Sequence, residues 1–385
     1  MTLPRSIGFP RMMKEPGELR VFLPEFIQSL AKRGLEVCVE EGYGSRSGLS
    51  FDDYRQANEA VWMGSRWEAF SQDLVLVLRA PSPNELEMAR RGACLISMLH
   101  FPTRPKRVER LVELGLNAVS LDSIANDVNL RLVENMRAVA WNGLEAAFGV
   151  LEERWGGLRR PDGRPIVVLI LGAGMVGKHA VEAATKMGNI ERANQALEGG
   201  LPGVIAQIVG RNISSDSREM ERLMRQADIL VDAAQRRHPS EPVVPNAWIA
   251  WLPEHAVIAD LAVDPYTLDI KPPVVRGVEG VPQGDLDQYV FHPDDPNWDK
   301  SVPSSIPSDH RRTTVTCYSW PGIHPEACMR HYAQQLNPLM DPLIEKGYDG
   351  LSPDGRYFER AMYRGSLRAW LQSPHYGARS RMEGD

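Results

Sequence analysis

Over the first 135 residues, short runs of apolar residues alternate with segments in which apolar and polar positions follow a helical pattern. The runs have the length of strands, whereas the helical patterns repeat apolar residues every three or four positions. Strands are predicted at residues 6–9, 35–40, 74–78, 93–99 and 118–121, and helices at 23–32 and 105–114. Strand and helix in repeated order predict a mostly parallel sheet with helices on both faces.

A long helical pattern at residues 133–155 ends at Gly156-Gly157 and leads into a second alternating region. That region predicts strands at 166–171, 204–209, 229–233 and 256–263, so a second α/β sheet is expected. Residues 187–203 are longer than a minimal connection and are interpreted as an extended helix and a loop. Further predictions are a loop at 279–307, helices at 325–343 and about 356–371, and a disordered polar tail.

The run Ile166-Val-Val-Leu-Ile-Leu171 leads directly into Gly172-x-Gly174-x-x-Gly177. In such a loop the first glycine makes a tight turn, the second lets backbone N–H groups approach a pyrophosphate, and the third lets the next helix pack on the strand. The positive N-terminal end of that helix would face the phosphates. We interpret the segment as a dinucleotide-binding loop; the alternative is an ordinary strand-to-helix turn.

Composition and charge restrict the partners. A chain of 385 residues predicts two domains, and a net charge of -6 without a dense Lys/Arg run excludes nucleic acid and anionic membrane as expected partners. The sequence shows neither an N-terminal apolar segment nor a window of roughly 20 apolar residues, which predicts a cytoplasmic protein. The four cysteines lack metal-ligand spacing, so reduced thiols and no metal site are expected.

Several short motifs, in consistent order, resemble the alanine dehydrogenase and pyridine nucleotide transhydrogenase family. They are Ile7-Gly-Phe-Pro-Arg11, Leu19-Arg-Val-Phe-Leu-Pro24, Val39-Glu-Glu-Gly-Tyr-Gly44, Val77-Leu-Arg-Ala-Pro81, Met98-Leu-His100, Ala259-Asp-Leu-Ala-Val-Asp264 and Trp320-Pro-Gly-Ile-His-Pro325. The resemblance covers roughly residues 5–345. It implies a Rossmann-type doubly wound NAD(P)-binding domain at 139–321, inserted into a flavodoxin-like α/β substrate domain formed from 1–138 and 322–385.

The resemblance also assigns roles to three matched residues. Arg20 would bind the substrate carboxylate, His100 would act on the substrate carbonyl or imine, and Asp264 would lie beside the nicotinamide ribose. Each has a plainer interpretation as well. Arg20 could be a surface arginine, His100 a core histidine, and Asp264 a cap for the turn before Pro265.

Three positions depart from the family pattern. Arg79 stands where the family has a substrate-site lysine, and a guanidinium keeps its charge but offers no accessible base. Ser319 replaces an asparagine. Gly210-Arg211 stands where an acidic residue would bind the adenosine ribose, which favours NADP over NAD. The expected cofactor-binding residues are Gly172, Ala173, Gly174, Met175, Val176, Gly177, Gly210, Arg211 and Ser319.

Together these features lead to the hypothesis of an NAD(P)-dependent oxidoreductase acting on an amino acid or its imine, with a small amino-acid or keto-acid substrate. His100 and Asp264 would be catalytic, and Arg20 and Arg79 would bind substrate. The alternatives are an opine- or saccharopine-type dehydrogenase, a transhydrogenase-like subunit, and a regulatory nucleotide-binding protein without chemistry. The resemblance further implies self-association into a homo-oligomer.

Overall fold

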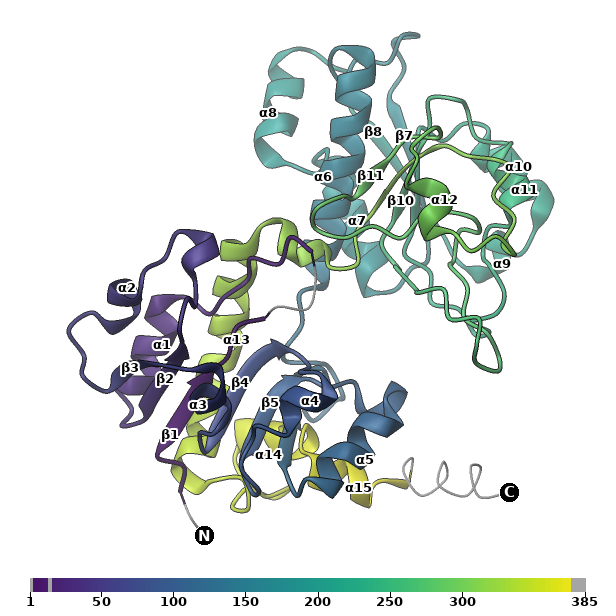
Figure 1. Ribbon diagram of the computed structural model, residues 1–385. Coiled ribbons are helices and arrows are strands. Elements are labelled where there is room, and N and C mark those ends of the chain that lie inside the picture. The colour runs from purple at the N-terminus through teal and green to yellow at the C-terminus, as the bar shows by residue number, and fades with distance from the viewer. Residues whose placement is uncertain (1–2, 13–15, 375–385) are drawn as a thin grey trace. The chain divides into compact units, whose positions relative to one another are not determined.

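The computed structural model describes residues 3–12 and 16–374, and divides them into two compact units. The first unit is formed by 3–12, 18–135 and 325–374, and therefore uses both ends of the chain (Figure 1). The second is formed by 16–17 and 136–324. Each unit has its own parallel sheet and its own core, as the alternating pattern predicted.

The first unit contains a six-stranded, fully parallel sheet in the order β3-β2-β1-β4-β5-β6. Its strands are β1 (Ser6–Phe9), β2 (Glu36–Glu40), β3 (Val61–Gly64), β4 (Leu74–Arg79), β5 (Cys94–Met98) and β6 (Asn117–Ser120). Five of the six were predicted. The polar connection on either side of β3 hid that strand, which has only four residues.

Helices cover both faces of this first sheet (Figure 1). One core joins the sheet to α1 (Pro24–Ala31), α13 (Pro325–Lys346) and α14 (Tyr357–Arg364). The other joins it to α3 (Arg66–Phe70), α4 (Pro83–Leu86), α5 (Pro105–Glu113) and α15 (Leu367–Gln372). The short α2 (Phe51–Arg55) precedes β3. Because α13 supplies buried residues to the first core, the end of the chain completes a sheet that its beginning forms.

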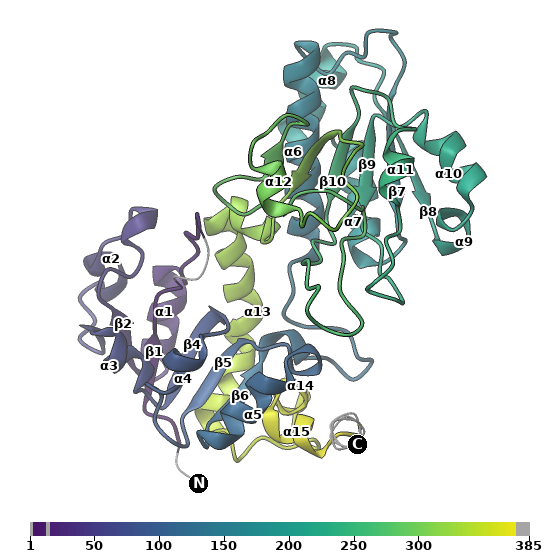
Figure 2. The same cartoon turned by 45° about the vertical axis from the view of Figure 1, so that its right-hand side comes forward.

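The second unit contains a sheet in the order β11-β12-β10-β9-β7-β8, parallel except for β11 (Figure 2). Its strands are β7 (Ile166–Leu171), β8 (Val204–Val209), β9 (Ile229–Asp232), β10 (Val257–Asp260), β11 (Val290–Phe291) and β12 (Thr313–Thr316). One face packs against α6 (Met136–Trp155), α7 (Met175–Thr185) and α8 (Ile190–Glu198). The other packs against α10 (Ser217–Met224) and α11 (Asn246–Ile249).

Three local predictions for this sequence were wrong, and one further strand, β12, was missed. The strand expected at 256–263 ends at Asp260, because the chain then turns and Val263 adopts a left-handed φ of 47°. The loop expected at 279–307 contains β11 and the short helix α12 (Trp298–Ser301), and the following β12 was not predicted. The helix expected at 356–371 is two helices separated at Gly365 and Ser366.

Two further expectations concern the remaining chain. The tail predicted to be disordered falls largely in 375–385, outside the described residues. Within the described residues, none of the helices has the length and apolar character needed to cross a membrane.

Candidate functional site

The glycine loop connects β7 to α7 in the second unit. Gly172 has a φ of 100°, and a Cβ at this position would lie 2.5 Å from the carbonyl oxygen of Ala233. A Cβ on Gly177 would overlap the carbonyl oxygen of Gly172, so the helix can approach the strand only without a side chain there. Gly174 differs, because a Cβ on it would meet no atom within 4 Å. Gly172 and Gly177 therefore allow the turn to close, whereas Gly174 leaves open space beside it.

That open space belongs to a cavity of about 690 Å³ at the carboxyl ends of β7, β8 and β9. Its lining includes the loop residues Gly172, Ala173 and Gly174 and, from the next strand end, Gly210 and Arg211. The helix α7 begins at Met175 without a side-chain cap, so its first N–H groups are available to an anion. The volume lies within the range of cofactor sites, and the residues fit a dinucleotide pyrophosphate.

A smaller cavity of about 340 Å³ shares the wall formed by Ala233, Ala234, Gln235 and Arg236. It extends from Val176 on α7 to Leu261 and Asp264 after β10. The two cavities therefore share a wall, and the smaller one reaches Asp264, a predicted catalytic residue. Neither cavity is lined by Met175 or Ser319; Met175 is half-exposed and Ser319 is buried, with its N–H directed at the Cys317 sulfur.

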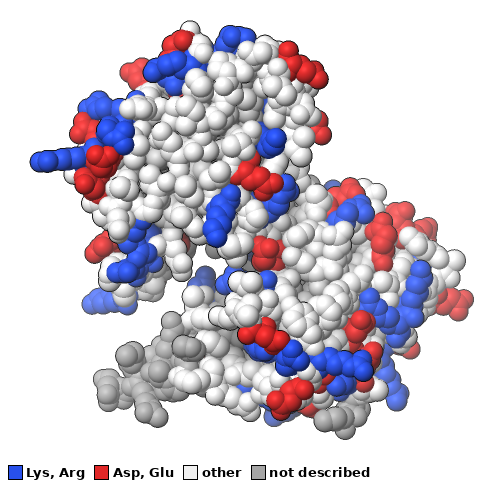
Figure 3. Space-filling view, turned by 180° about the vertical axis from the view of Figure 1, so that it is seen from behind, with Lys and Arg blue, Asp and Glu red and all other residues white. Residues whose placement is uncertain are grey.

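Basic side chains gather at the far wall of the larger cavity. Arg211, at the start of α9 (Arg211–Ser214), donates from Nη2 to the Gln235 carbonyl at 3.1 Å. Arg236, Arg237 and His238 follow the end of β9 and line the same cavity. The sequence prediction named only Arg211, although an Arg-Arg-His run just after a buried strand was a usable signal. On the face shown in Figure 3, by contrast, basic and acidic side chains are intermixed.

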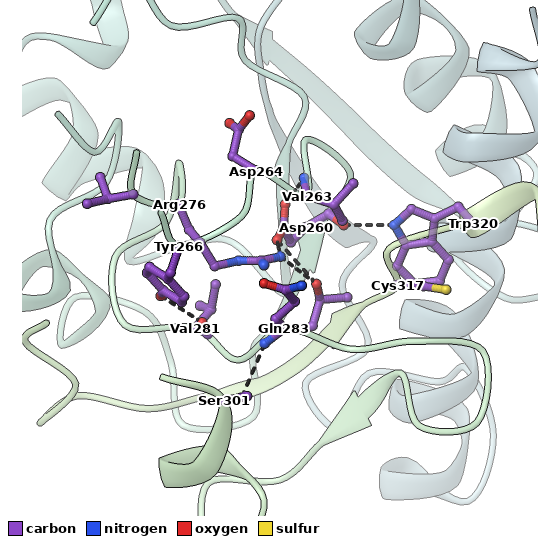
Figure 4. A network of polar contacts seen from close by, with 12 residues as sticks. Asp260, Val263, Asp264, Tyr266, Arg276, Val281, Gln283, Ser301, Cys317 and Trp320 are labelled. Atoms are coloured by element: carbon purple, nitrogen blue, oxygen red, sulfur yellow. Dashed lines mark hydrogen bonds and ion pairs between the residues drawn. The ribbon is translucent and has the colours of Figure 1, made fainter. Parts of the chain in front are cut away.

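Asp264 is held by an ion pair. Its Oδ2 lies 2.8 Å from Nη2 of Arg236, whose side chain is 6% exposed, while that of Asp264 is 38% exposed. Arg236 also donates to the carbonyl oxygens of Pro239, Glu241 and Val275. The carboxylate is thus oriented by Arg236 and open to the smaller cavity. In Figure 4 it points away from the buried contacts around Asp260.

Arg20 lies in the first unit and is buried with Glu18. The carboxylate of Glu18 accepts from Arg20 Nε at 2.8 Å, Nη2 at 2.5 Å and the backbone N–H at 2.9 Å. Burial opposes the charge of the guanidinium, but the bonds and charge of Glu18 outweigh it and raise the pKa of Arg20. Half of the arginine fork is therefore already occupied by a carboxylate.

His100 follows β5 with a left-handed φ of 53°. The ring Nδ1 lies 3.3 Å from Asp122 Oδ2, and the backbone N–H of His100 donates to Asp122 Oδ1 at 3.1 Å. Ser120 Oγ donates to the same oxygen at 2.7 Å. Burial disfavours the charged carboxylate, but the hydrogen bond and charge of His100 prevail and lower the pKa of Asp122 to about 2.

This arrangement orients the imidazole. Because Nδ1 faces Asp122 and the ring is 51% exposed, Nε2 is left for proton transfer. Asp122 was not among the predicted site residues; the polar Ser120-x-Asp122 at the end of an apolar strand was the signal that could have identified it.

Arg79 ends β4 and lines a small cavity of about 180 Å³ together with Arg11, Arg66 and Glu85. The buried Glu40 lies beside this cavity and accepts from Arg11 Nε at 3.0 Å and from Arg66 Nη1 at 2.7 Å. Glu40 thus forms ion pairs with arginines at this cavity, as Glu18 does with Arg20. The described residues contain no group of three or more His, Cys, Asp or Glu side chains able to hold a metal ion.

The chain is similar to known proteins over both matched domains of one family. Residues 9–140 match the family model described as alanine dehydrogenase/PNT, N-terminal domain, and residues 144–265 match its C-terminal domain. The alanine dehydrogenase of Mycolicibacterium smegmatis is 27% identical over 271 residues, which cover 67% of this chain and 72% of that protein. The NAD(P) transhydrogenase subunit alpha of Haemophilus influenzae is 26% identical over 193 residues, covering 49% of this chain and 37% of the subunit.

Solved structures show the same fold. An L-alanine dehydrogenase superposes with a TM-score of 0.68 at 23% identity, covering 94% of both chains. A transhydrogenase from Sinorhizobium meliloti superposes with a TM-score of 0.59 at 17% identity, covering 88% of this chain and 95% of that one. The two matched domains, in this order and with this fold, show that the chain belongs to the alanine dehydrogenase/PNT family.

Proposed function

We propose that this protein is an NAD(P)-dependent dehydrogenase that transfers hydride between nicotinamide and the α-carbon of an amino acid or its imine. One observation carries the proposal: the glycine loop opens into a cavity whose wall continues to the oriented carboxylate of Asp264. The names of the similar alanine dehydrogenases support an amino-acid substrate.

The second unit supplies the cofactor site. Backbone N–H groups at Gly174 and the start of α7 would bind the pyrophosphate, and Asp264 would accept hydrogen bonds beside the nicotinamide ribose. When bound, the nicotinamide supplies the hydride acceptor or donor. The protein's part is to hold and orient it.

Proton transfer falls to His100. In the oxidative direction the amino acid loses hydride from its α-carbon and a proton from its nitrogen, and the imine is then hydrolysed to a keto acid and ammonia. His100, held by Asp122 through Nδ1, would exchange protons through Nε2. Arg79 cannot take this role near neutral pH, because a guanidinium stays protonated. Arg20 and Arg79 would hold the carboxylate of the substrate.

For the cofactor we propose a preference for NADP. Arg211 follows β8, where a 2′-phosphate would be placed, and Arg237 and His238, which follow β9, line the same cavity. Gly210 leaves the end of β8 without a carboxylate. Ser214 and Ser215 already donate to the Arg211 carbonyl, so the positive charges rather than these hydroxyls would bind the phosphate.

A fluorescence titration with NADH and NADPH, followed by a screen of keto acids with ammonium or amino acids, tests the proposal. We expect both cofactors to bind, NADPH more tightly, and at least one keto acid to oxidise the reduced cofactor in this screen. Arg211→Ala should weaken NADPH binding by about tenfold, near 1.4 kcal/mol, and leave NADH nearly unchanged. Binding without any turnover would point to a regulatory nucleotide-binding protein instead.

His100 is tested separately. His100→Ala should lower kcat by about 10²-fold or more, the usual contribution of a positioned acid or base, and leave cofactor affinity unchanged. Asp122→Asn should give a smaller loss, since the ring stays but its orientation is weakened. Near-normal turnover in His100→Ala would remove it from the mechanism.

A transhydrogenase-like activity is the second candidate, because 193 residues resemble a transhydrogenase subunit alpha. Hydride exchange between NADH and an oxidised NADP analogue, without amino or keto acid, would favour it. An opine- or saccharopine-type reaction is distinguished in the same screen, because it requires an amino acid in place of ammonium.

A further inference from the structure

A buried polar cluster lies at the carboxyl ends of β9, β10 and β12, where Asp232, Asp260 and Thr316 occupy one register of the sheet. The three side chains are buried, with relative exposures of 2% or less. Arg276, from the loop that follows β10, enters this cluster and is 1% exposed (Figure 4). None of these residues is used by the proposed mechanism.

Asp260 is the centre of the cluster. Its Oδ2 forms an ion pair with Arg276 Nη2 and accepts from Thr316 Oγ1 at 3.2 Å. Arg276 Nη2 also donates to Thr316 Oγ1 at 2.8 Å. The other carboxylate oxygen, Oδ1, accepts from the backbone N–H of Val263 at 2.9 Å. The same carboxylate therefore joins a buried guanidinium to the turn that precedes Asp264.

The turn needs such support. Val263 has a left-handed φ of 47°, a conformation that β-branched residues rarely adopt, and its N–H bond to Asp260 stabilises it. The carbonyl of Asp260 accepts from Trp320 Nε1 at 2.8 Å, which fixes the start of the turn as well. One residue further on, Asp264 forms its ion pair with Arg236.

The loop that carries Arg276 is fixed at two consecutive residues. Gly277 packs so closely on Asp232 that a Cβ would overlap Asp232 Oδ2. Within the described residues, that oxygen and the Nε and Nη1 of Arg276 have no hydrogen-bond partner. The cluster thus leaves buried polar atoms without hydrogen bonds, which is unfavourable for stability. What these contacts do maintain is the conformation of the Arg276 loop and of the turn at Val263.

We propose that Arg276 and Asp260 are a positioning pair: the buried guanidinium holds the carboxylate that fixes Val263, and this sets the direction of Asp264. The role in turnover rests on the proposed function, whereas the effect on the turn does not. Arg276 and Asp260 act through Asp264 and contact neither cofactor nor substrate in this assignment.

Hydrogen exchange measured by mass spectrometry tests the effect on the turn in the full-length protein. Arg276→Met should accelerate exchange in peptides covering 261–266 by about tenfold to hundredfold, because Asp260, which accepts from the Val263 N–H, loses the side chain that holds it in place. Arg276→Lys keeps the charge and should recover part of the protection.

Arg160→Met is the matched control. Arg160 Nη1 lies 2.9 Å from Asp228 Oδ2, and Asp228 is fully buried at the opposite, amino end of β9. Both variants remove a guanidinium from a buried aspartate, so both should lower the melting temperature. Only Arg276→Met should change exchange at 261–266. Equal acceleration in both variants, or none in Arg276→Met, overturns the proposal.

Kinetics then test the consequence for the reaction. Arg276→Met should lower kcat by about 10²-fold, the effect of a displacement near 1 Å, and change NADPH affinity less than threefold. Arg160→Met should keep kcat within twofold. If exchange changes while kcat does not, the pair has no positioning role in the reaction. If the unsubstituted protein shows no turnover, the proposed function fails and exchange alone decides whether Arg276 fixes the turn.

Discussion

Three charged side chains of the candidate site are each held by one specific partner. Glu18 neutralises Arg20 from two positions away, Asp122 orients His100 from the next strand, and Arg236 holds Asp264. Sequence could name Arg20, His100 and Asp264 because each matches a family motif. The partners were missed: Glu18 lies two positions from Arg20, whereas the meeting of Asp122 with His100 and of Arg236 with Asp264 follows from which strand ends are neighbours.

Asp232 gives a prediction about pH. Burial and the nearby Asp260 raise the pKa of Asp232, so the folded protein keeps this proton at a pH where the unfolded chain has lost it. Folding stability therefore falls as the pH rises from the ordinary carboxyl pKa to the raised pKa, by about 1.4 kcal/mol for each pH unit in that interval. Asp232→Asn cannot ionise and should escape this loss.

Urea unfolding at pH 5 and pH 8 checks the sign. The advantage of Asp232→Asn over the unsubstituted protein should grow between these two values. A difference that stays the same at both would show that Asp232 has an ordinary pKa in the folded state.

The Glu18–Arg20 pair gives a second prediction. Arg20→Leu should cost about 3–5 kcal/mol, because it leaves the Glu18 carboxylate buried and unpaired. Glu18→Leu together with Arg20→Leu should recover most of that stability. If Arg20 binds substrate, turnover stays lost in the stable double variant; recovered turnover would make the arginine structural only.

At the scale of elements, periodicity predicted most strands and helices, and close packing explains the misses. Asp260 is the only polar residue in 256–263, and one polar residue inside an apolar run does not by itself mark the end of a strand. The strand ends in a local turn, in which the N–H of Val263 donates to the side chain of Asp260 three residues before it. Likewise, Gly365 separates α14 from α15 where the chain packs against Ile124.

The β7–loop–α7 element gives a prediction with its own control. Gly174→Ala adds a methyl group to open space, so stability should change by less than about 0.5 kcal/mol, while cofactor affinity falls at least about tenfold. Gly177→Ala places its methyl group on the Gly172 carbonyl and should cost about 1–3 kcal/mol of stability.

Thermal unfolding and NADPH titration of the two variants separate these effects. The loop assignment would be wrong if Gly174→Ala bound cofactor normally.

At the scale of the molecule, the two units differ in how the chain forms them. The second is nearly continuous, from 136 to 324, whereas the first needs α13 and α14 from the end of the chain. Buried residues of α13, including Tyr332, Leu336 and Met340, belong to the core beneath β1, β4 and β5. Removing 325–374 therefore leaves α1 as the only one of the three helices in this core to cover that face of the first sheet.

A fragment comparison checks this difference. Fragment 136–324 should unfold cooperatively and gain about 2.7 kcal/mol of stability at NADPH concentrations a hundredfold above its Kd. Fragment 1–135 should lack a cooperative transition until 325–385 is supplied. Circular dichroism melts of both fragments measure this, and a cooperative melt of 1–135 alone would contradict the shared core.

The sequence by itself determined the two parallel sheets, the glycine loop and the family, because these depend on local periodicity and on motifs contiguous in the chain. Only the tertiary structure decided which charges meet: Asp122 with His100, Arg236 with Asp264, and Arg276 with Asp260. The members of these pairs lie 16 to 28 residues apart. Strand order and register, which no local pattern encodes, bring such distant side chains to one sheet edge.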